Sequence, residues 1–173
     1  VFTGVDLGLS TRVTADETAI VTIAVYGNGL RQLLNVTAGR WDLFEKAKKI
    51  AEVYQNFRPA KIMVENNQGQ RLLVEHLQGT TDLPVIGYQT GDAKANPLTG
   101  VEAISGAMAQ GKWAIPSRDG TMKGITDPNK PEASAEVFKL TEEALYFTPE
   151  KHTGDRLMAL WFADILARRH TNP

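Results

Sequence analysis

The order of strand-like and helix-like segments is the feature that most constrains how this chain can fold. Three apolar segments with strand character come before any helical pattern, at 2–8, 18–26 and 30–36. The last two are joined by the tight-turn sequence Gly-Asn-Gly at 27–29, so the three segments predict an antiparallel meander. Helix-like and strand-like segments alternate afterwards, which predicts a mixed α/β sheet flanked by helices.

The later segments extend this sheet and cover it. Apolar residues fall at helical spacing within 40–57, and the pattern ends at Arg58-Pro59. We expect a five-stranded sheet in which three antiparallel strands are followed by parallel additions at 61–65 and 84–89. The expected helices span 40–57, 70–77, 96–110, 132–146 and 151–169, with a short extended piece at 113–116 and a loop at 117–131.

Length and composition indicate a single domain with an ordinary core, because 42% of the 173 residues are hydrophobic. The 19 basic and 20 acidic residues nearly balance, so any surface for nucleic acid would have to be a local patch. The absence of cysteine excludes disulfides and thiolate metal sites. Asp, Glu and His remain as candidate ligands, and they favour hard, oxygen-preferring cations.

No targeting or membrane segment is evident in the sequence. No apolar stretch approaches the roughly 20 residues of a membrane span, and the N-terminus lacks the basic start of a secretory signal. We therefore expect a cytoplasmic protein with no membrane partner. The chain opens inside a strand without an initiator Met, which indicates a fragment of a longer protein.

Asp6 is an acid inside the first apolar strand. Side chains alternate along a strand, so Asp6 shares its side with Gly4 and Gly8, and this leaves room for a cation or a phosphate. An ionised carboxylate is costly to bury alone, so Asp6 needs a partner. The alternative to a ligand is a carboxylate that caps a turn or meets an Arg.

Glu65 closes the strand-like segment 61–65, on the side opposite to Ile62 and Val64. Sites in α/β sheets collect at the carboxyl ends of strands, so this position favours a functional role. The alternative is that Glu65 only caps the helix that follows.

The last predicted helix carries two more candidates. His152 and Asp155 are three residues apart and share a face. Asp164 lies nearly half a turn around the helix from Asp155, so we expect it to be solvated or paired with Arg168. If Gly154 is instead the N-cap, Asp155 is a first-turn acid that the helix dipole favours.

Asp6, Glu65 and Asp155 are spaced along an order of elements that can bring them together. Three like charges in a sheltered site repel one another by several kcal/mol, so a divalent cation is the natural counterion. The joint pattern therefore predicts a metal site, although each acid alone is a weak signal.

Three short motifs resemble the ribonuclease-H-like nuclease domain of bacteriophage terminase large subunits, the motors that package viral DNA. They are GVDLG in the first strand, VENN at the end of the fourth and HTGDRLMALWFAD in the last helix. The resemblance extends from the first strand to about Arg168. His152, the Ala159-Leu160 pair and the DETAIV start of the second strand point to terminases rather than to resolvases or transposases of the same superfamily.

The resemblance implies an endonuclease that cuts concatemeric double-stranded DNA at the start and end of packaging, with two Mg²⁺ or Mn²⁺ ions. Asp6 would bridge both ions, Glu65 and Asp155 would hold one each, and His152 would orient or ligate near the second. The resemblance also implies an ATPase domain ahead of the nuclease. The terminase small subunit and the capsid portal would then be partners of the full-length protein.

Two features set this chain apart from the pattern of the family. Many relatives follow the helical acid with a second acid or an amide, whereas Arg156 comes next here, which puts a fourth acidic ligand in doubt. No GxxxxGK[ST] phosphate loop occurs, so the chain alone is not expected to hydrolyse ATP or translocate DNA.

The expected DNA contacts are basic residues between 94 and 130, namely Lys94, Lys112, Arg118 and Lys123. Lys94 is the strongest candidate because it follows the fifth strand, at a carboxyl end. Phosphate contacts carry little sequence information, so cleavage is expected to be largely unspecific. The alternative for each of these residues is a solvated basic side chain.

Three other functions stay open. A Holliday-junction resolvase would use the same three acids on a branched substrate. The fold could also serve only to dock a capsid portal, without catalysis. The GVDLG strand followed by a hairpin also fits the phosphate loop of an actin-like or sugar-kinase fold, but those proteins need a duplicated second half and glycine-rich adenosine motifs that this chain lacks.

Overall fold

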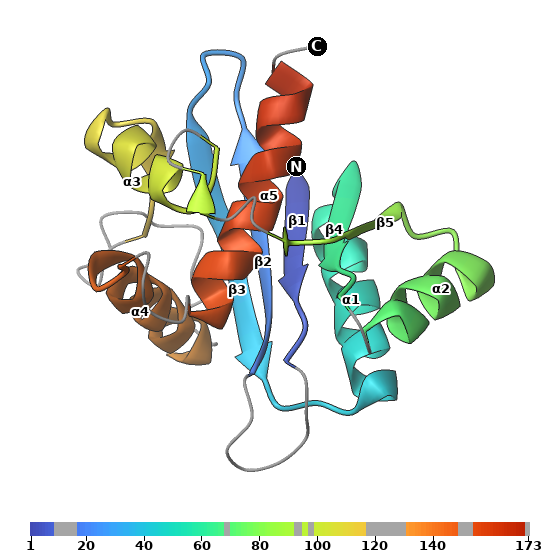
Figure 1. Ribbon diagram of the computed structural model, residues 1–173. Coiled ribbons are helices and arrows are strands. Elements are labelled where there is room, and N and C mark those ends of the chain that lie inside the picture. The colour runs from blue at the N-terminus through green and yellow to red at the C-terminus, as the bar shows by residue number, and fades with distance from the viewer. Residues whose placement is uncertain are drawn as a thin grey trace.

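The predicted meander forms the centre of a mixed sheet in the computed structural model of this chain (Figure 1). The structure describes residues 1–8, 17–67, 70–91, 95–96, 99–116, 131–148 and 154–171. The predicted order of antiparallel and parallel strands is confirmed. The antiparallel strands are β1 (Phe2–Asp6), β2 (Thr18–Val25) and β3 (Arg31–Gly39), while β4 (Lys61–Glu65) adds in parallel to β1 and β5 (Val85–Tyr88) adds in parallel to β4.

A sixth strand, β6 (Trp113–Ala114), extends the sheet beyond the predicted five strands. It pairs in parallel with β3, and the full strand order is β5-β4-β1-β2-β3-β6. The prediction of a short extended piece at this place was correct, but the strand count was wrong by one. Two residues are too few for the alternation that identifies a strand in a sequence.

The described residues form five helices beside the sheet, and local chemistry explains where the first one begins. The side chain of Asp42 accepts the Glu45 N–H at 2.8 Å, and the Asp42 N–H donates to the Glu45 side chain at 3.1 Å. This capping box starts the first helix at Leu43 rather than at the expected position 40. The helices are α1 (Leu43–Phe57), α2 (Arg71–Thr80), α3 (Glu102–Ala109), α4 (Pro131–Leu145) and α5 (Asp155–Thr171).

The helix expected at 96–110 is shorter in the structure, where it begins at Glu102. The Asn96 side chain accepts the Thr99 N–H at 3.1 Å, so Asn96 closes a turn instead of capping the helix. Most of the expected loop, residues 117–130, lies outside the described residues. Within the described ranges, none of the helices combines the length and the apolar character that a membrane crossing requires.

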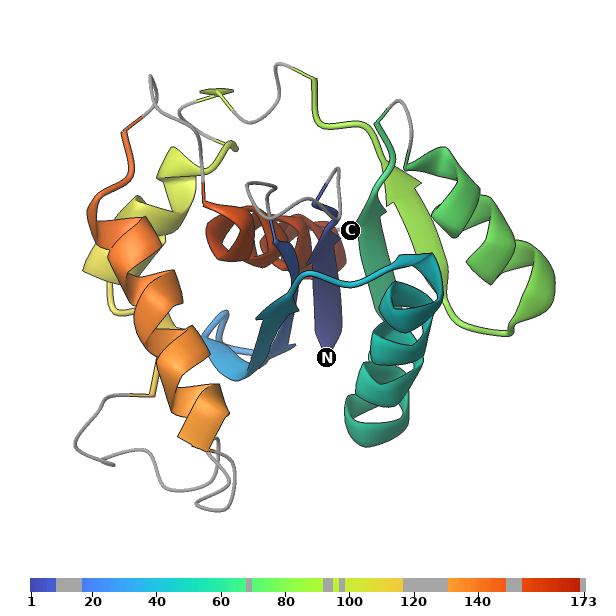
Figure 2. The same ribbon diagram turned by 90° about the horizontal axis from the view of Figure 1, so that it is seen from below.

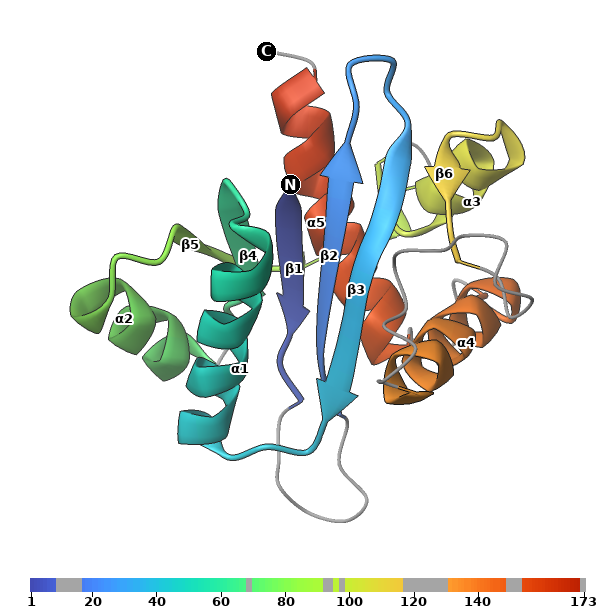
Figure 3. The same ribbon diagram turned by 180° about the vertical axis from the view of Figure 1, so that it is seen from behind.

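Helices cover both faces of the sheet. Figures 2 and 3 show α5 on one side of the sheet and α1 on the other. Phe2 and Met63 pack into the core beneath α5, whereas Val5 and Val64 pack into the core beneath α1 and α2. This alternation fixes which side chains at the ends of β1 and β4 face α5.

α5 is buried on almost every side, because every residue from 156 to 167 is buried. A helix that covers a sheet usually buries one stripe, but here α4 also packs against α5 and the Trp161 indole N–H donates to the Thr99 carbonyl at 3.0 Å. A Cβ on Gly4 would lie 2.0 Å from the Ala159 carbonyl oxygen, so only glycine lets α5 approach β1 this closely. The rings of Phe2 and His170 lie 5.4 Å apart, so α5 runs antiparallel to β1 and starts near the end of β1.

Candidate functional site

The register of β1 and β4 brings Asp6 and Glu65 together. Val5 is the register partner of Val64 in this parallel pair, so the two acids end neighbouring strands at the same level. The backbones of the two strands lie about 4.8 Å apart. Both acids point to the α5 side of the sheet, since Val5 and Val64 point away from it. Each acid is only 9% exposed. The predicted meeting of these two acids at the carboxyl ends of their strands is therefore present in the structure.

Three neutral donors hold the carboxylate of Glu65. Its Oε1 accepts from Asn67 Nδ2 at 2.7 Å and from Thr90 Oγ1 at 3.1 Å, while its Oε2 accepts from Gln70 Nε2 at 3.0 Å. No ion pair joins Glu65 to any described residue. A buried carboxylate is usually paired with a cation, so this one is fixed in place while its charge is left for a cation from outside the described chain.

Gln70 links the two strands that carry the acids. Its Nε2 also donates to the carbonyl of Leu7, the residue after Asp6, and its Oε1 accepts the Asn67 N–H at 3.2 Å. Sequence reasoning missed this residue. The only signal in the sequence is the polar run Asn66 to Gln70 that separates β4 from α2.

Lys46 holds the carbonyl of the next residue of the chain, Gly8. Its Nζ donates to the Gly8 carbonyl at 2.9 Å, and burial lowers the pKa of this lysine. The end of β1 is thus anchored from α1 by Lys46 and from the start of α2 by Gln70. Both anchors act on the main chain within two residues of Asp6, so they restrict where its carboxylate can lie.

Asp155 is the first residue of α5, as the alternative reading of this acid expected. Its Oδ2 accepts the Glu17 N–H at 2.8 Å, just before β2. Ala19, two residues further on, is the register partner of Asp6. Asp155 therefore lies over the same end of the sheet as Asp6, in the helix turn where the dipole favours a negative charge.

Arg156 is a buried cation that joins three separate parts of the chain. It is 4% exposed and donates to Glu17 at 2.6 Å, to Glu136 at 2.6 Å and to Glu143 at 3.0 Å. Burial by itself lowers the pKa of Arg156, but the three carboxylates outweigh this effect and raise it. The same contact with Arg156 lowers the pKa of Glu17. Arg156, which stands where many members of the family have an acid or an amide, thus fixes the start of α5.

Glu143 completes the attachment of α5 to α4. It accepts the Leu157 N–H at 2.9 Å and so caps the helix from a neighbouring element. A Cβ on Gly154 would lie 2.4 Å from a carboxylate oxygen of Glu143, so any larger residue there would displace this side chain. These contacts hold Asp155 in its place from both sides.

The predicted set of three metal-binding acids is not assembled as such. Among the described residues, no group of three or more His, Cys, Asp or Glu side chains is arranged to hold a metal ion. Asp6 and Glu65 offer oxygen donors of the kind that Mg²⁺ and Mn²⁺ prefer, so this pair fits a hard divalent cation. Asp155 lies near them but is bonded to the Glu17 amide.

The space beside Asp6 is smaller than the sequence suggested. The two glycines on its side of β1 were expected to leave room for an ion or a phosphate. At Gly4 the room is filled by the backbone of α5, because Ala159 and Ala163 would collide with any side chain there. The Gly4 side of Asp6 therefore offers no room for an ion or a phosphate.

Most of the other predicted site residues lie outside the described residues, namely His152, Lys94, Arg118 and Lys123. Lys112 is described and exposed, but it precedes β6 and its carbonyl accepts the N–H of Arg31, the first residue of β3. β3 runs in the same direction as β1, so Lys112 lies at the opposite end of the strands from Asp6. The structure does not bring it to the acids.

Asp164 is buried and paired, so the expectation of a solvated acid was wrong and that of a pair with Arg168 is confirmed. Its carboxylate lies 2.6 Å from Arg168 Nη2 and also pairs with Arg31 Nε. This acid joins β3 to the end of α5 and is remote from Asp155 along the helix.

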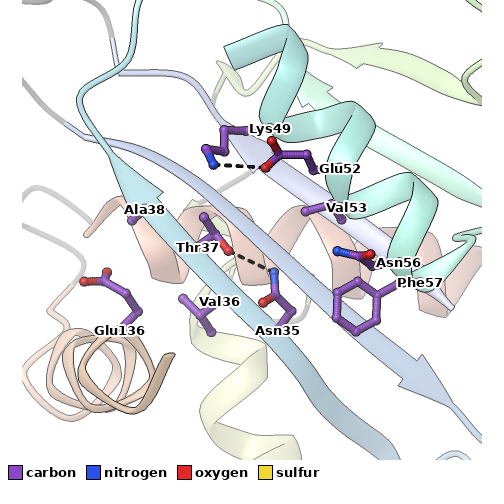
Figure 4. Close-up of a pocket in the computed structure, with 10 residues that line it drawn as sticks. All are labelled: Asn35, Val36, Thr37, Ala38, Lys49, Glu52, Val53, Asn56, Phe57 and Glu136. Carbon is purple, nitrogen blue, oxygen red and sulfur yellow. Dashed lines mark hydrogen bonds and ion pairs between the residues drawn. The ribbon is translucent and has the colours of Figure 1, made fainter. Parts of the chain in front are cut away.

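A separate cavity of about 570 Å³ lies between β3, α1 and α4 (Figure 4). Its polar side chains largely satisfy one another, since Lys49 pairs with Glu52 and Asn35 donates to Thr37. None of the three acids lines it. This cavity is not part of the candidate site.

Comparison with known proteins identifies the fold. No family model matches the sequence, and neither does any curated protein. The crystal structure of the HK97 bacteriophage large terminase matches with a TM-score of 0.55 and 14% identity, over 93% of this chain and 38% of the terminase chain. The Thermus thermophilus RuvC structure matches with a TM-score of 0.50 and 16% identity, over 98% of this chain and 96% of RuvC. The chain has a ribonuclease-H-like fold.

The ribonuclease-H-like fold accounts for the place of the acids. A third match, Thermus thermophilus RuvC in complex with a Holliday junction substrate, has a TM-score of 0.47 at 16% identity, again over 98% of this chain and 96% of the RuvC chain. At such identities the matches establish the fold alone. In this fold, the pairing of β1 with β2 and β4 places Asp6 and Glu65 at one end of the strands. The start of α5 places Asp155 at the same end.

Proposed function

We propose that this chain is a nuclease domain that hydrolyses phosphodiester bonds of DNA with Mg²⁺ or Mn²⁺. The observation that carries the proposal is the pair of buried acids, Asp6 and Glu65, which end neighbouring parallel strands on one face of the sheet. Glu65 is held only by neutral donors among the described residues, so a divalent cation would supply the missing positive charge.

The residues of the chain would divide the work as follows. Asp6 and Glu65 would hold one cation, and Asp155, with Asp6, would hold the second that the family resemblance implies. When bound, a divalent cation would polarise the phosphodiester and lower the pKa of a water molecule. Asn67, Gln70 and Thr90 would keep the Glu65 carboxylate oriented, and the contacts of Arg156 would keep Asp155 at the same end of the sheet as Asp6.

The finer part of the proposal is a role in viral DNA packaging, as in terminase large subunits. The nuclease would cut double-stranded concatemers as an endodeoxyribonuclease. It would belong to a full-length protein with an ATPase domain that meets a small subunit and a capsid portal. The GVDLG, VENN and HTGDRLMALWFAD motifs support this reading, together with a TM-score that is higher for the HK97 terminase than for RuvC.

A Holliday-junction resolvase is the second candidate. The match to RuvC spans nearly the whole of both chains, whereas the match to the terminase spans 38% of that chain. The two candidates differ in substrate. A resolvase cuts a four-way junction in preference to linear duplex, whereas a packaging nuclease cuts linear duplex without a branch.

A plasmid digest tests the proposal. Supercoiled plasmid is incubated with the protein in Mn²⁺, in Mg²⁺ or in EDTA, and a linear duplex and a four-way junction are compared in parallel. We expect nicking and linearisation with the cations and none in EDTA. Equal cutting in EDTA would contradict a metal-dependent site. No cutting under any condition would favour the third reading, a docking module without catalysis.

A further inference from the structure

A second feature on the face of the sheet that carries Glu65 is a cleft of about 250 Å³ between the end of β5 and the last turns of α5. Tyr88 lines it and is the register partner of Glu65 on the neighbouring strand, so the cleft begins one strand away from the candidate site. Its lining residues are Tyr88, Thr99, Trp161, Ile165, Arg168 and Arg169.

Arg169 presents its donors to solvent at this cleft. It is exposed, and its guanidinium carbon lies 5.8 Å from the centroid of the Tyr88 ring. A guanidinium group stacked on an aromatic ring uses its flat face, which leaves the N–H groups on its edge available for a planar, bidentate partner. No ion pair connects Arg169 to another residue of the described ranges.

The charges around the cleft do not cancel. Asp164 is shared between Arg31 and Arg168, so one carboxylate faces two guanidinium groups. Arg31 does not line the cleft, so among the described residues Arg168, Arg169 and the shared Asp164 carboxylate leave an excess of one positive charge there. Cations in the last turn of α5 also suit the helix dipole, but the dipole does not account for a cavity with an apolar floor of Trp161 and Ile165 beneath them.

We propose that this cleft binds the phosphodiester backbone of the DNA that flanks the bond to be cut. The inference rests on the proposed nuclease function and adds a contact that neither the motifs nor the comparisons assign. Phosphate is the anion whose geometry matches an arginine edge.

The length of α5 sets how far this contact lies from the acids. Arg169 follows Asp155 by 14 residues, which is about 21 Å along the helix axis. Successive phosphates of one DNA strand rise by about 3.4 Å along the axis of the duplex, so the contact lies roughly six nucleotides from the acids. The cleft would therefore hold DNA that flanks the cut.

The test measures DNA binding without cutting. Arg169→Ala and the unaltered protein are titrated against a short fluorescent duplex in EDTA, between about 50 and 200 mM salt. We expect Arg169→Ala to bind about threefold to tenfold more weakly, with a salt slope smaller by about one, and equally for two unrelated duplex sequences. Arg71→Ala is the matched control, because Arg71 is exposed on α2 and pairs only with Glu75 there.

The outcomes separate this inference from the proposed function. Three results would overturn the proposal that the cleft binds DNA. They are an unchanged affinity for DNA in Arg169→Ala, an equal loss of affinity in Arg71→Ala, and no DNA binding by the unaltered protein. A loss in Arg169→Ala that depended on base sequence would overturn a backbone contact. If Arg169→Ala weakened binding as expected but the unaltered protein cut no DNA with Mn²⁺, the cleft would stand and the nuclease proposal would fail.

Discussion

The side-chain amide of Gln70 donates to the carboxylate of Glu65 at 3.0 Å, and the same nitrogen donates to the carbonyl of Leu7, next to Asp6. One buried amide therefore contacts both strands that carry the paired acids. Its hydrogen bonds tie the Glu65 side chain to the main chain that follows Asp6. Gln70 is a positioning residue in the proposed mechanism.

Gln70→Leu is expected to raise the Mn²⁺ concentration needed for half-maximal plasmid nicking by about tenfold to a hundredfold. The substitution removes both donors, so the Glu65 carboxylate loses its orientation. The increase in melting temperature on adding Mn²⁺ should shrink in parallel, which reports on binding without activity. Gln78→Leu is the control, because Gln78 lies on the same helix and donates only to the Val85 carbonyl. Equal Mn²⁺ midpoints for Gln70→Leu and Gln78→Leu would contradict the positioning role.

Each of the three acids is replaced by its amide, in Asp6→Asn, Glu65→Gln and Asp155→Asn. Each variant is expected to reduce Mn²⁺-dependent nicking by more than about a hundredfold. About a hundredfold is the largest loss usual for residues that only support a metal ligand, so a ligand itself should cost more. Each amide keeps the shape and an acceptor oxygen but removes the charge. Circular dichroism should show an unchanged fold. Glu75→Gln, at an exposed acid of α2, should cut like the unaltered protein. Full activity in Asp6→Asn would exclude the site.

Arg156→Met is expected to lower the free energy of unfolding by about 3 kcal/mol at pH 7, because three carboxylates lose their shared cation. The value is at the low end for a buried pair, since the carboxylates are partly exposed. Urea denaturation of both proteins measures it. A change below about 0.5 kcal/mol, typical of a surface substitution, would contradict the bridging role.

The stabilisation by Arg156 should also depend on pH. The pKa of Glu17 is lowered in the folded state by its contact with Arg156, so this contribution is fully present above the ordinary glutamate value of about 4.3. This contribution to stability is lost as the pH falls below about 4.3 and then through the lowered pKa of Glu17 in the folded state. The difference in melting temperature between the unaltered protein and Arg156→Met should therefore narrow on acidification. A constant difference from pH 7 to pH 3 would rule out this linkage.

Gly4→Ala and Gly106→Ala are expected to change stability in opposite directions. A Cβ at Gly4 would meet the Ala159 carbonyl at 2.0 Å, so α5 must shift and stability should fall by about 3 kcal/mol or more. A Cβ at Gly106 meets nothing within 4 Å in the exposed part of α3, so alanine should stabilise the protein by about 0.5 to 1 kcal/mol. Chemical denaturation of both variants checks the signs.

Local patterns made the central strands and four of the five helices predictable to within a few residues. Short apolar segments identified β1, β2 and β4, and helical spacing identified α1. Alternation of side chains along β1 and β4 placed Asp6 and Glu65 on one side of their strands before any contact was known. β6 was missed because it has two residues, and the start of α3 was placed too early because Asn96 is equally suited to a turn.

The contacts that organise the site were not predictable, because they join residues distant in the chain. Gln70 lies 63 residues from Leu7, and Arg156 lies 139 residues from Glu17. A glutamine or an arginine in a sequence does not indicate which distant carbonyl or carboxylate it will meet. The space at Gly4 was misjudged for the same reason, since its occupant comes from α5.

The contact at Gly4 has a consequence for how such a chain can change over time. Main-chain atoms of Ala159 and Ala163 meet the strand there, so the gap between α5 and β1 does not depend on the size of the surrounding core side chains. Substitutions elsewhere in the interior can therefore accumulate while the distance between Asp155 on α5 and Asp6 on β1 stays the same. A fold built in this way can retain the spacing of its acids after nearly all other resemblance to its relatives has gone.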